Sequence, residues 1–115
     1  NDQKLVEQKV QIDVYHMQVL RYFLDKLQET NDGDQSLLDS SLIVYGSAMG
    51  DGNQHAFHDI PTLILGKGAG RINSGRHITR QDVPMTNLLL SVLDRVGVSV
   101  EKLGDSTGKL DLASV

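Results

Sequence analysis

Residues 41–66 read SLIVYGSAMGDGNQHAFHDIPTLILG, and this stretch decides the fold. A short apolar run is followed by a polar, turn-rich segment and then by a second apolar run. Both runs are rich in β-branched residues and leucine and are too short for helices, so they predict buried strands at Leu42–Tyr45 and Thr62–Leu65. The ~16 residues between them exceed a hairpin loop, and a connection of this length usually carries a site or a lid.

Amphipathic segments flank this stretch on both sides. Upstream, apolar residues recur at helical spacing from Leu5 to Leu27 and form two stripes. The first stripe contains Val6, Val10, Val14, Met17, Leu20, Leu24 and Leu27, and the second contains Ile12, Val19 and Phe23. Together they form a wide apolar face, which suits packing on a sheet better than a narrow coiled-coil seam. Gly33 is expected to end this helix in a left-handed conformation.

A second helix is predicted over Pro84–Val96, with Asp82 and Pro84 at its start and Gly97 closing it. Its expected apolar face consists of Leu88, Leu89, Val92, Leu93 and Val96. A short edge strand is expected at His77–Thr79. These elements predict a single α/β domain over residues 1–115, built as a three-layer αβα sheet with neighbouring, parallel strands covered by the two helices.

Composition narrows the classes of function. The 115-residue chain has a formal net charge of −4, which argues against a nucleic-acid binder, because such a protein needs a basic face. It has no cysteine, so disulfides, thiolate nucleophiles and cysteine-ligated zinc are excluded. No run of ~18 apolar residues is present, so no membrane span is expected.

The polar segment concentrates groups that bind metals or transfer protons: Asp51, Asn53, His55, His58 and Asp59. Imidazole and carboxylate ligands suit divalent zinc, manganese or iron, so the histidines and aspartates are metal-ligand candidates. Two other interpretations remain open, namely a structural hydrogen-bonding role and proton transfer within a larger protein.

Polar residues outside this segment include His77 and His16, and Ser47 lies at the end of the first run. His77 is either a fifth metal-ligand candidate or a structural polar residue, and Ser47 is a hydrogen-bonding candidate at a strand end. His16 lies mid-helix and is expected to be structural. The glycine-rich segments at Gly66–Gly70 and Gly104–Lys109 lack the spacing and strand–helix context of a phosphate loop, so no nucleotide cofactor is expected.

Several strings together resemble a known family. Residues 36–70, then GRHI, PMTNLLLSVLDRVGV and GDSTGKL, are similar to the C-terminal part of an uncharacterised bacterial family named for a His-x-x-Ser-His-His motif. The resemblance runs from about Leu5 to Leu110, although the naming motif itself is missing from this chain. Members are exported and several times longer. The resemblance therefore implies a C-terminal fragment of a periplasmic or extracellular protein, whose upstream part would be its partner.

The expected order of strands and helices is also remotely similar to the C-terminal part of proteins of the alkaline phosphatase and sulfatase superfamily. There a strand runs into a Ser-Asp-His-Gly metal motif, but here Ala48 and Met49 stand where the Asp-His pair would be. Residues 84–98 match the later helix pattern, and His77 matches a later histidine. The resemblance implies an alkaline phosphatase-like fold and a divalent metal in the full-length protein.

Two functions follow as hypotheses. The chain is part of a metal-dependent hydrolase, or it is a non-catalytic binding or assembly module that keeps the fold without the metal chemistry. The wide apolar face of the first helix also predicts a homo-oligomer, with Val6, Ile12 and Val19 at the contact.

Overall fold

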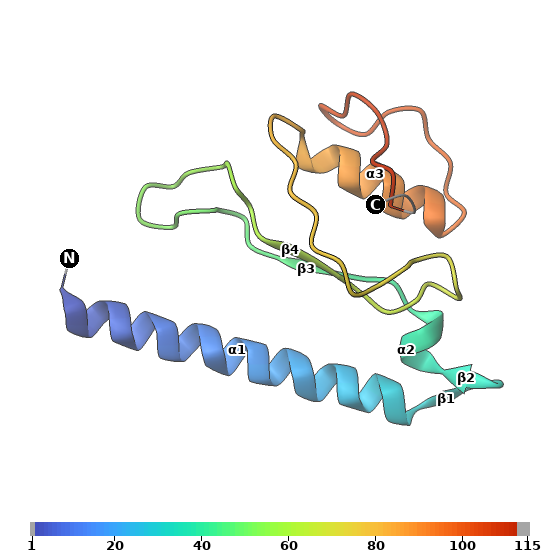
Figure 1. Cartoon of the computed structure of the whole chain (residues 1–115), viewed down its shortest axis with the longest axis horizontal. Helices are drawn as coiled ribbons and strands as arrows, with labels where there is room; N and C mark the ends of the chain where they lie inside the picture. The colour runs from blue at the N-terminus through green and yellow to red at the C-terminus, as the bar shows by residue number, and fades with distance from the viewer. Residues whose placement is uncertain (1, 113–115) are drawn as a thin grey trace. The chain divides into compact units, whose positions relative to one another are not determined.

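A computed structural model describes residues 2–112, and Figure 1 shows the order of its elements. The chain divides into two compact units, one ending at Leu38 and the other beginning at Asp39. The first unit holds helix α1 and strands β1 and β2; the second holds β3, β4 and α3, while the short helix α2 (Leu37–Ser40) spans the division. Helices combined with two small antiparallel sheets make this a mixed α/β chain, as the sequence predicted at that level.

Helix α1 (Gln3–Glu29) begins two residues before the predicted start and ends two after the predicted end. The side chain of Asp2 accepts a hydrogen bond from the Lys4 amide at 3.0 Å, which satisfies one of the free amides of the first turn. At the other end, the Thr30 hydroxyl donates to the Lys26 carbonyl at 2.7 Å. Leu20 is buried, whereas most of the other apolar side chains of α1 are exposed.

Strands β1 (Asn31–Asp32) and β2 (Gln35–Ser36) form a two-residue-loop hairpin directly after α1. Gly33 has a positive φ of 64°, as predicted, but it occupies the first central position of the hairpin turn, where glycine is favoured. The prediction that Gly33 ends the helix is therefore wrong. The asparagine, aspartates and glycine at this point form the hairpin because α1 is already capped at Thr30.

Strands β3 (Ile43–Gly46) and β4 (Thr62–Leu65) form the sheet of the second unit. Their positions match the two predicted runs to within one residue, but the pair is antiparallel, with Ile43 opposite Leu65 and Gly46 opposite Thr62. The predicted parallel pairing is wrong. A parallel pair needs a crossover, whereas the connection at residues 47–61, here called the β3–β4 loop, turns back on itself through an Asp51–Ala56 bridge.

Helix α3 (Met85–Arg95) lies in the second unit, and Pro84 occupies its N-cap position. Its C-terminus confirms the predicted role of Gly97, which has a φ of 87°. The Gly97 amide donates to the Asp94 carbonyl at 3.1 Å, and the Val98 amide donates to the Leu93 carbonyl at 2.9 Å. These two bonds are the pair that defines a Schellman motif.

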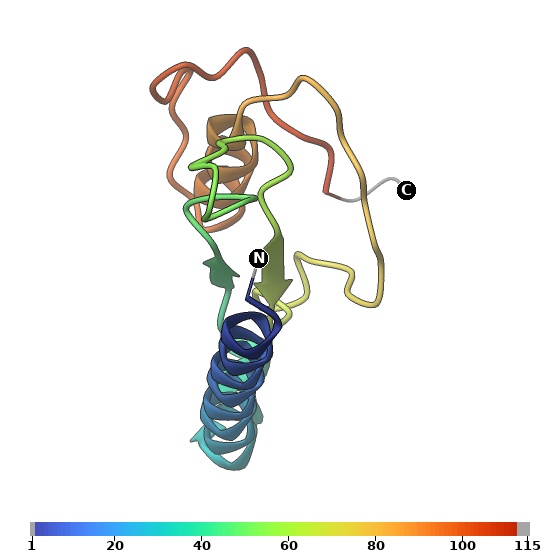
Figure 2. The same ribbon diagram turned by 90° about the vertical axis from the view of Figure 1, so that its left-hand side faces the viewer.

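The buried side of α3 differs from the predicted apolar face. Leu90 is 1% exposed, and Asn87 and Ser91 are also buried, while Val96 is 52% exposed. Ile72 and Leu112 are the other buried apolar residues of this unit. The chain after α3 returns past the helix in both views (Figures 1 and 2), and this return explains why a polar stripe of α3 is covered.

Residues 77–79, expected as an edge strand, lie instead in an irregular segment between β4 and α3. His77 and Thr79 are exposed and Ile78 is half-buried. A three-residue segment is too short for its sequence pattern to distinguish a strand from an extended connection.

Candidate functional site

The β3–β4 loop carries every predicted site residue except His77, and its fold is set by short local hydrogen bonds. Ser47, at the end of β3, donates its amide to the Pro61 carbonyl at 3.3 Å, and its hydroxyl accepts from the Met49 amide at 3.2 Å. Ser47 thus makes local hydrogen bonds at the end of a strand. Its hydroxyl stabilises the turn by which the chain leaves the sheet.

Asp51 holds the tip of the loop. Its carboxylate oxygen Oδ1 accepts from the amides of Asn53 at 2.8 Å and Gln54 at 3.2 Å, which makes an Asx-type turn. Its backbone carbonyl accepts from the Ala56 amide at 3.0 Å, and the Gly50 amide donates to the Ala56 carbonyl at 3.0 Å. One carboxylate oxygen of Asp51 is thus already engaged by the backbone.

His55, His58 and Asp59 are exposed residues on the returning half of the loop. His55 and Asp59 both have a φ of 53°, a left-handed conformation in which a side chain is uncommon outside turns. The ring nitrogen Nδ1 of His58 lies 2.9 Å from Asp59 Oδ2, and their side chains are 80% and 91% exposed. Both side chains of this pair therefore lie largely in water.

The five metal-ligand candidates do not converge. Among residues 2–112, no group of three or more histidine, cysteine, aspartate or glutamate side chains is arranged to hold a metal ion. His58 and Asp59 contact each other, Asp51 contacts its own loop, and His77 lies beyond β4 on an exposed segment. The geometry of this part of the chain supports local hydrogen bonding by these residues.

A second polar arrangement, not anticipated from the sequence, lies between α3 and residues 103–112, here called the strap. The side-chain amide of Asn87 makes two bonds to Thr107: Oδ1 accepts from the Thr107 amide at 2.8 Å, and Nδ2 donates to the Thr107 hydroxyl at 3.0 Å. Asn87 is 6% exposed, and its side chain both donates a hydrogen bond to the strap and accepts one from it.

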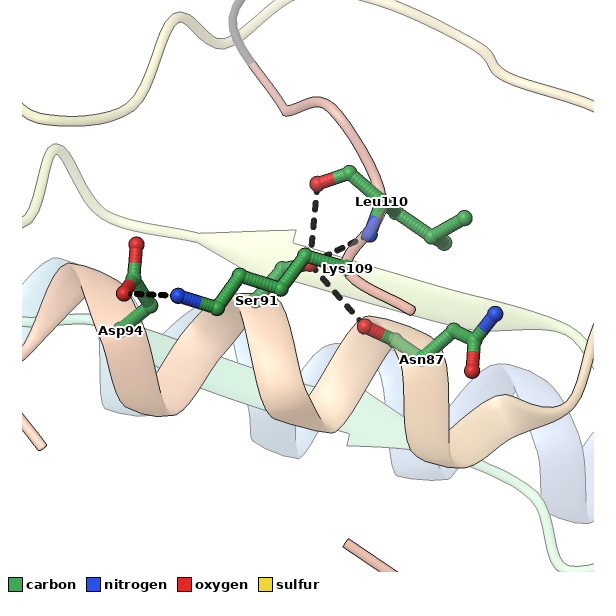
Figure 3. A network of polar contacts seen from close by, with 5 residues as sticks. All are labelled: Asn87, Ser91, Asp94, Lys109 and Leu110. Atoms are coloured by element: carbon green, nitrogen blue, oxygen red, sulfur yellow. Dashed lines mark hydrogen bonds and ion pairs between the residues drawn. The ribbon is translucent and has the colours of Figure 1, made fainter. Parts of the chain in front are cut away.

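Ser91 repeats this two-point contact one helical turn further along (Figure 3). Its hydroxyl oxygen accepts from the Leu110 amide at 2.6 Å and donates to the Leu110 carbonyl at 2.8 Å. The Asn87 carbonyl lies 3.0 Å from the same oxygen. A hydroxyl has one hydrogen to donate, so the shorter bond to Leu110 competes with the bond within the helix.

Charged contacts lie beside these two. Lys109 pairs with Asp94, and the hydrogen bond from the Lys109 ammonium lowers the pKa of the Asp94 carboxyl below its ordinary value. Near the start of α3, the Thr86 hydroxyl donates to Asp105 Oδ1 at 2.5 Å. At its end, Arg71 Nη1 donates to the Arg95 carbonyl at 2.7 Å, which places a cation where the helix carbonyls are free.

A sequence signal for the strap contact did exist. Asn87, Ser91 and Asp94 recur at i, i+4 and i+7 in a helix that is otherwise rich in leucine, and this spacing places them on one face. A polar line of this kind inside an apolar helix indicates a covered polar contact. The sequence does not indicate which segment covers it.

Comparisons with models of known protein families, with curated proteins and with solved structures find no match. Within residues 2–112, no helix combines the length and the apolar character needed to cross a bilayer.

Proposed function

We propose that this chain is a non-catalytic assembly module that associates with a second copy of itself through α1. The observation that supports the proposal is the exposure of apolar side chains along that helix. Leu5, Ile12, Val19 and Phe23 are 61%, 52%, 48% and 47% exposed. Burial of apolar surface stabilises a protein by roughly 25 cal/mol per Å². A helix that leaves such a stripe in water is therefore stabilised when it pairs with another apolar surface.

The spacing of the stripe favours a second copy as the occupant. Leu5, Ile12 and Val19 are seven residues apart, and a seven-residue repeat keeps one face turned toward a partner helix as the two wind around each other. A copy of α1 carries the same repeat and therefore matches it along its length. Val6, which is 45% exposed, lies at the margin of this stripe and joins the contact.

Sedimentation velocity tests the association. The unmodified chain is expected to dimerise or form a higher oligomer at ~100 µM and to dissociate on dilution. Ile12→Gln combined with Val19→Gln is expected to give a monomer with unchanged helical dichroism, because glutamine has at least as high a helix propensity as either residue. The matched control is Gln11→Ala with Gln18→Ala, also seven residues apart but outside the stripe. A monomeric unmodified chain at ~100 µM would overturn the proposal.

A second candidate rests on the His58–Asp59 pair and on the family resemblance. In it, the chain is the C-terminal part of a longer exported, alkaline phosphatase-like hydrolase with a three-layer αβα sheet and a divalent metal. An imidazole held 2.9 Å from a carboxylate is a common arrangement at metal and proton-transfer sites. Metal analysis of the longer protein, with and without His58→Ala, tests it: a stoichiometric metal lost in the variant supports the hydrolase, and equal metal content counts against it.

A further inference from the structure

The strap contacts α3 through its backbone as well as through its side chains. The amides of Thr107 and Leu110 both donate to side chains of the helix, and the Leu110 carbonyl accepts from one. Main-chain hydrogen bonds of this type give affinity for an extended segment with limited dependence on its sequence, as when a peptide is added to a sheet edge. In this chain the side chains of Asn87 and Ser91 on α3 take the place that the backbone of a sheet edge has in that mode of binding.

The receiving side chains are built for such a segment. Asn87 is 6% and Ser91 3% exposed, and each provides a donor and an acceptor to one residue of the strap. A buried polar group that loses its partner destabilises the folded chain unless another partner or water replaces it. Once the strap lifts, these groups therefore favour an equivalent chain segment.

The flanking contacts add selectivity. Lys109 of the strap pairs with Asp94, which lies on the same face of α3 as Asn87 and Ser91. The helix therefore recognises a cation two residues after Thr107. Leu110 is half-buried and Leu112 is 6% exposed, so apolar side chains are accepted at these positions. The strap also has a turn of its own, in which the Ser106 amide donates to the Leu103 carbonyl at 2.9 Å.

We propose that the face of α3 carrying Asn87, Ser91 and Asp94 is a binding site for an extended polypeptide segment, which the strap occupies as an internal ligand. The partner has the strap's chemistry: a hydroxyl residue, a lysine two positions later and a leucine next. The site is separate from the association through α1, and neither depends on the other.

A tethered ligand blocks its site in proportion to the time it is bound. The apparent dissociation constant of an external segment equals the intrinsic one divided by the fraction of chains with the strap open. A strap on a short tether has an effective concentration on the order of millimolar, so external binding to the unmodified chain is weak. A change that opens the strap without altering α3 therefore tightens external binding.

Thr107→Pro provides such a change, because proline has no amide hydrogen to donate to Asn87 Oδ1. The probe is a labelled synthetic peptide with the sequence of residues 103–112. We expect the Thr107→Pro chain to bind it at least about tenfold more tightly than the unmodified chain does. Adding Asn87→Ala to Thr107→Pro is expected to remove this gain. Lys102→Ala, with the strap contacts kept, is the control and is expected to bind like the unmodified chain.

A second measurement needs no variant. Excess peptide added to the unmodified chain is expected to accelerate hydrogen exchange of the Leu110 amide, because the strap is displaced, while a peptide with proline at the position of Thr107 leaves the rate unchanged. The proposal is overturned if Thr107→Pro folds and binds no more tightly than the unmodified chain. It is equally overturned if excess peptide does not alter the exchange of the Leu110 amide.

Discussion

A Cβ atom on Gly50 would lie 2.0 Å from the carbonyl oxygen of His58 and 3.1 Å from that of Asp59. The two halves of the β3–β4 loop therefore touch at a point where only glycine fits. This contact lies next to the Gly50–Ala56 hydrogen bond of 3.0 Å, so it is part of what folds the loop back on itself. It also places the segment that carries His58 and Asp59.

Gly50→Ala is expected to destabilise the chain and displace this segment. The obstacle is backbone, which cannot rotate away as a flexible side chain can, and overpacking of this kind costs about 1–3 kcal/mol. The measurement is the urea midpoint, together with the amide chemical shifts of residues 56–60. Gly52→Ala is the matched control, because a Cβ there meets nothing within 4 Å. Equal midpoints for the two variants would show that the loop does not rely on this contact.

The sequence predicted the elements better than their pairing. The apolar run at Thr62–Leu65 is the strand β4 itself, and the run at Leu42–Tyr45 differs from β3 by one residue. An apolar run does not encode the direction of its neighbour, however, and a connection of this length is compatible with either direction. The antiparallel direction of β3 and β4 depends on the close approach at Gly50 and on the Asp51–Ala56 bridge. Both are contacts between particular residues, which the composition of a segment does not reveal.

The candidate site shows the same limit. The sequence identified the loop residues that can bind a metal, but ligand geometry requires several side chains to point at one place. Asp51 instead turns toward the amides of Asn53 and Gln54, and His58 toward Asp59. Such short-range hydrogen bonds compete with a shared site and cannot be weighed from residue types alone.

The Asp94–Lys109 contact predicts a pH dependence of known sign. The Lys109 hydrogen bond keeps the pKa of the Asp94 carboxyl below its ordinary value in the folded chain. The contribution of the pair to stability is therefore present above the pKa of the unfolded chain and is lost as the pH falls through the lower folded value. Lys109→Met is expected to raise the Asp94 pKa, measured by NMR titration of its carboxyl carbon. Lys102→Met is the control, and an unchanged Asp94 pKa in Lys109→Met would contradict the assignment.

The purified chain is expected not to hydrolyse an aryl phosphate or aryl sulfate, with or without added zinc or manganese. Two-metal hydrolysis of such esters needs both ions held about 3.5–4 Å apart by a shared set of ligands. Asp51, His58 and Asp59 are each engaged locally instead. The measurement is release of the coloured phenol above a buffer blank. Metal-dependent turnover that disappears in His55→Ala would contradict this prediction and favour the hydrolase.

Asp105 is expected to stabilise α3 from outside the helix. Pro84 at the N-cap has no side-chain acceptor, and the first turn, Met85 to Leu88, contains no acid. The Asp105 carboxylate, 2.5 Å from the Thr86 hydroxyl, places a negative charge near the free amides of that turn, where it interacts favourably with the helix dipole. Asp105→Ala should therefore lower the free energy of unfolding by ~1 kcal/mol, measured by urea denaturation.

Asp105→Asn separates the charge from the hydrogen bond. Asparagine keeps an oxygen for the Thr86 hydroxyl but carries no charge, so it should lose only part of the effect seen with Asp105→Ala. The difference between aspartate and asparagine should also shrink in ~1 M salt, because exposed charges are screened there. Glu101→Ala, an exposed acid just before the strap, is the matched control and should leave the unfolding free energy nearly unchanged. If Glu101→Ala and Asp105→Ala cost the same, the effect is one of net charge, and the strap does not cap the helix.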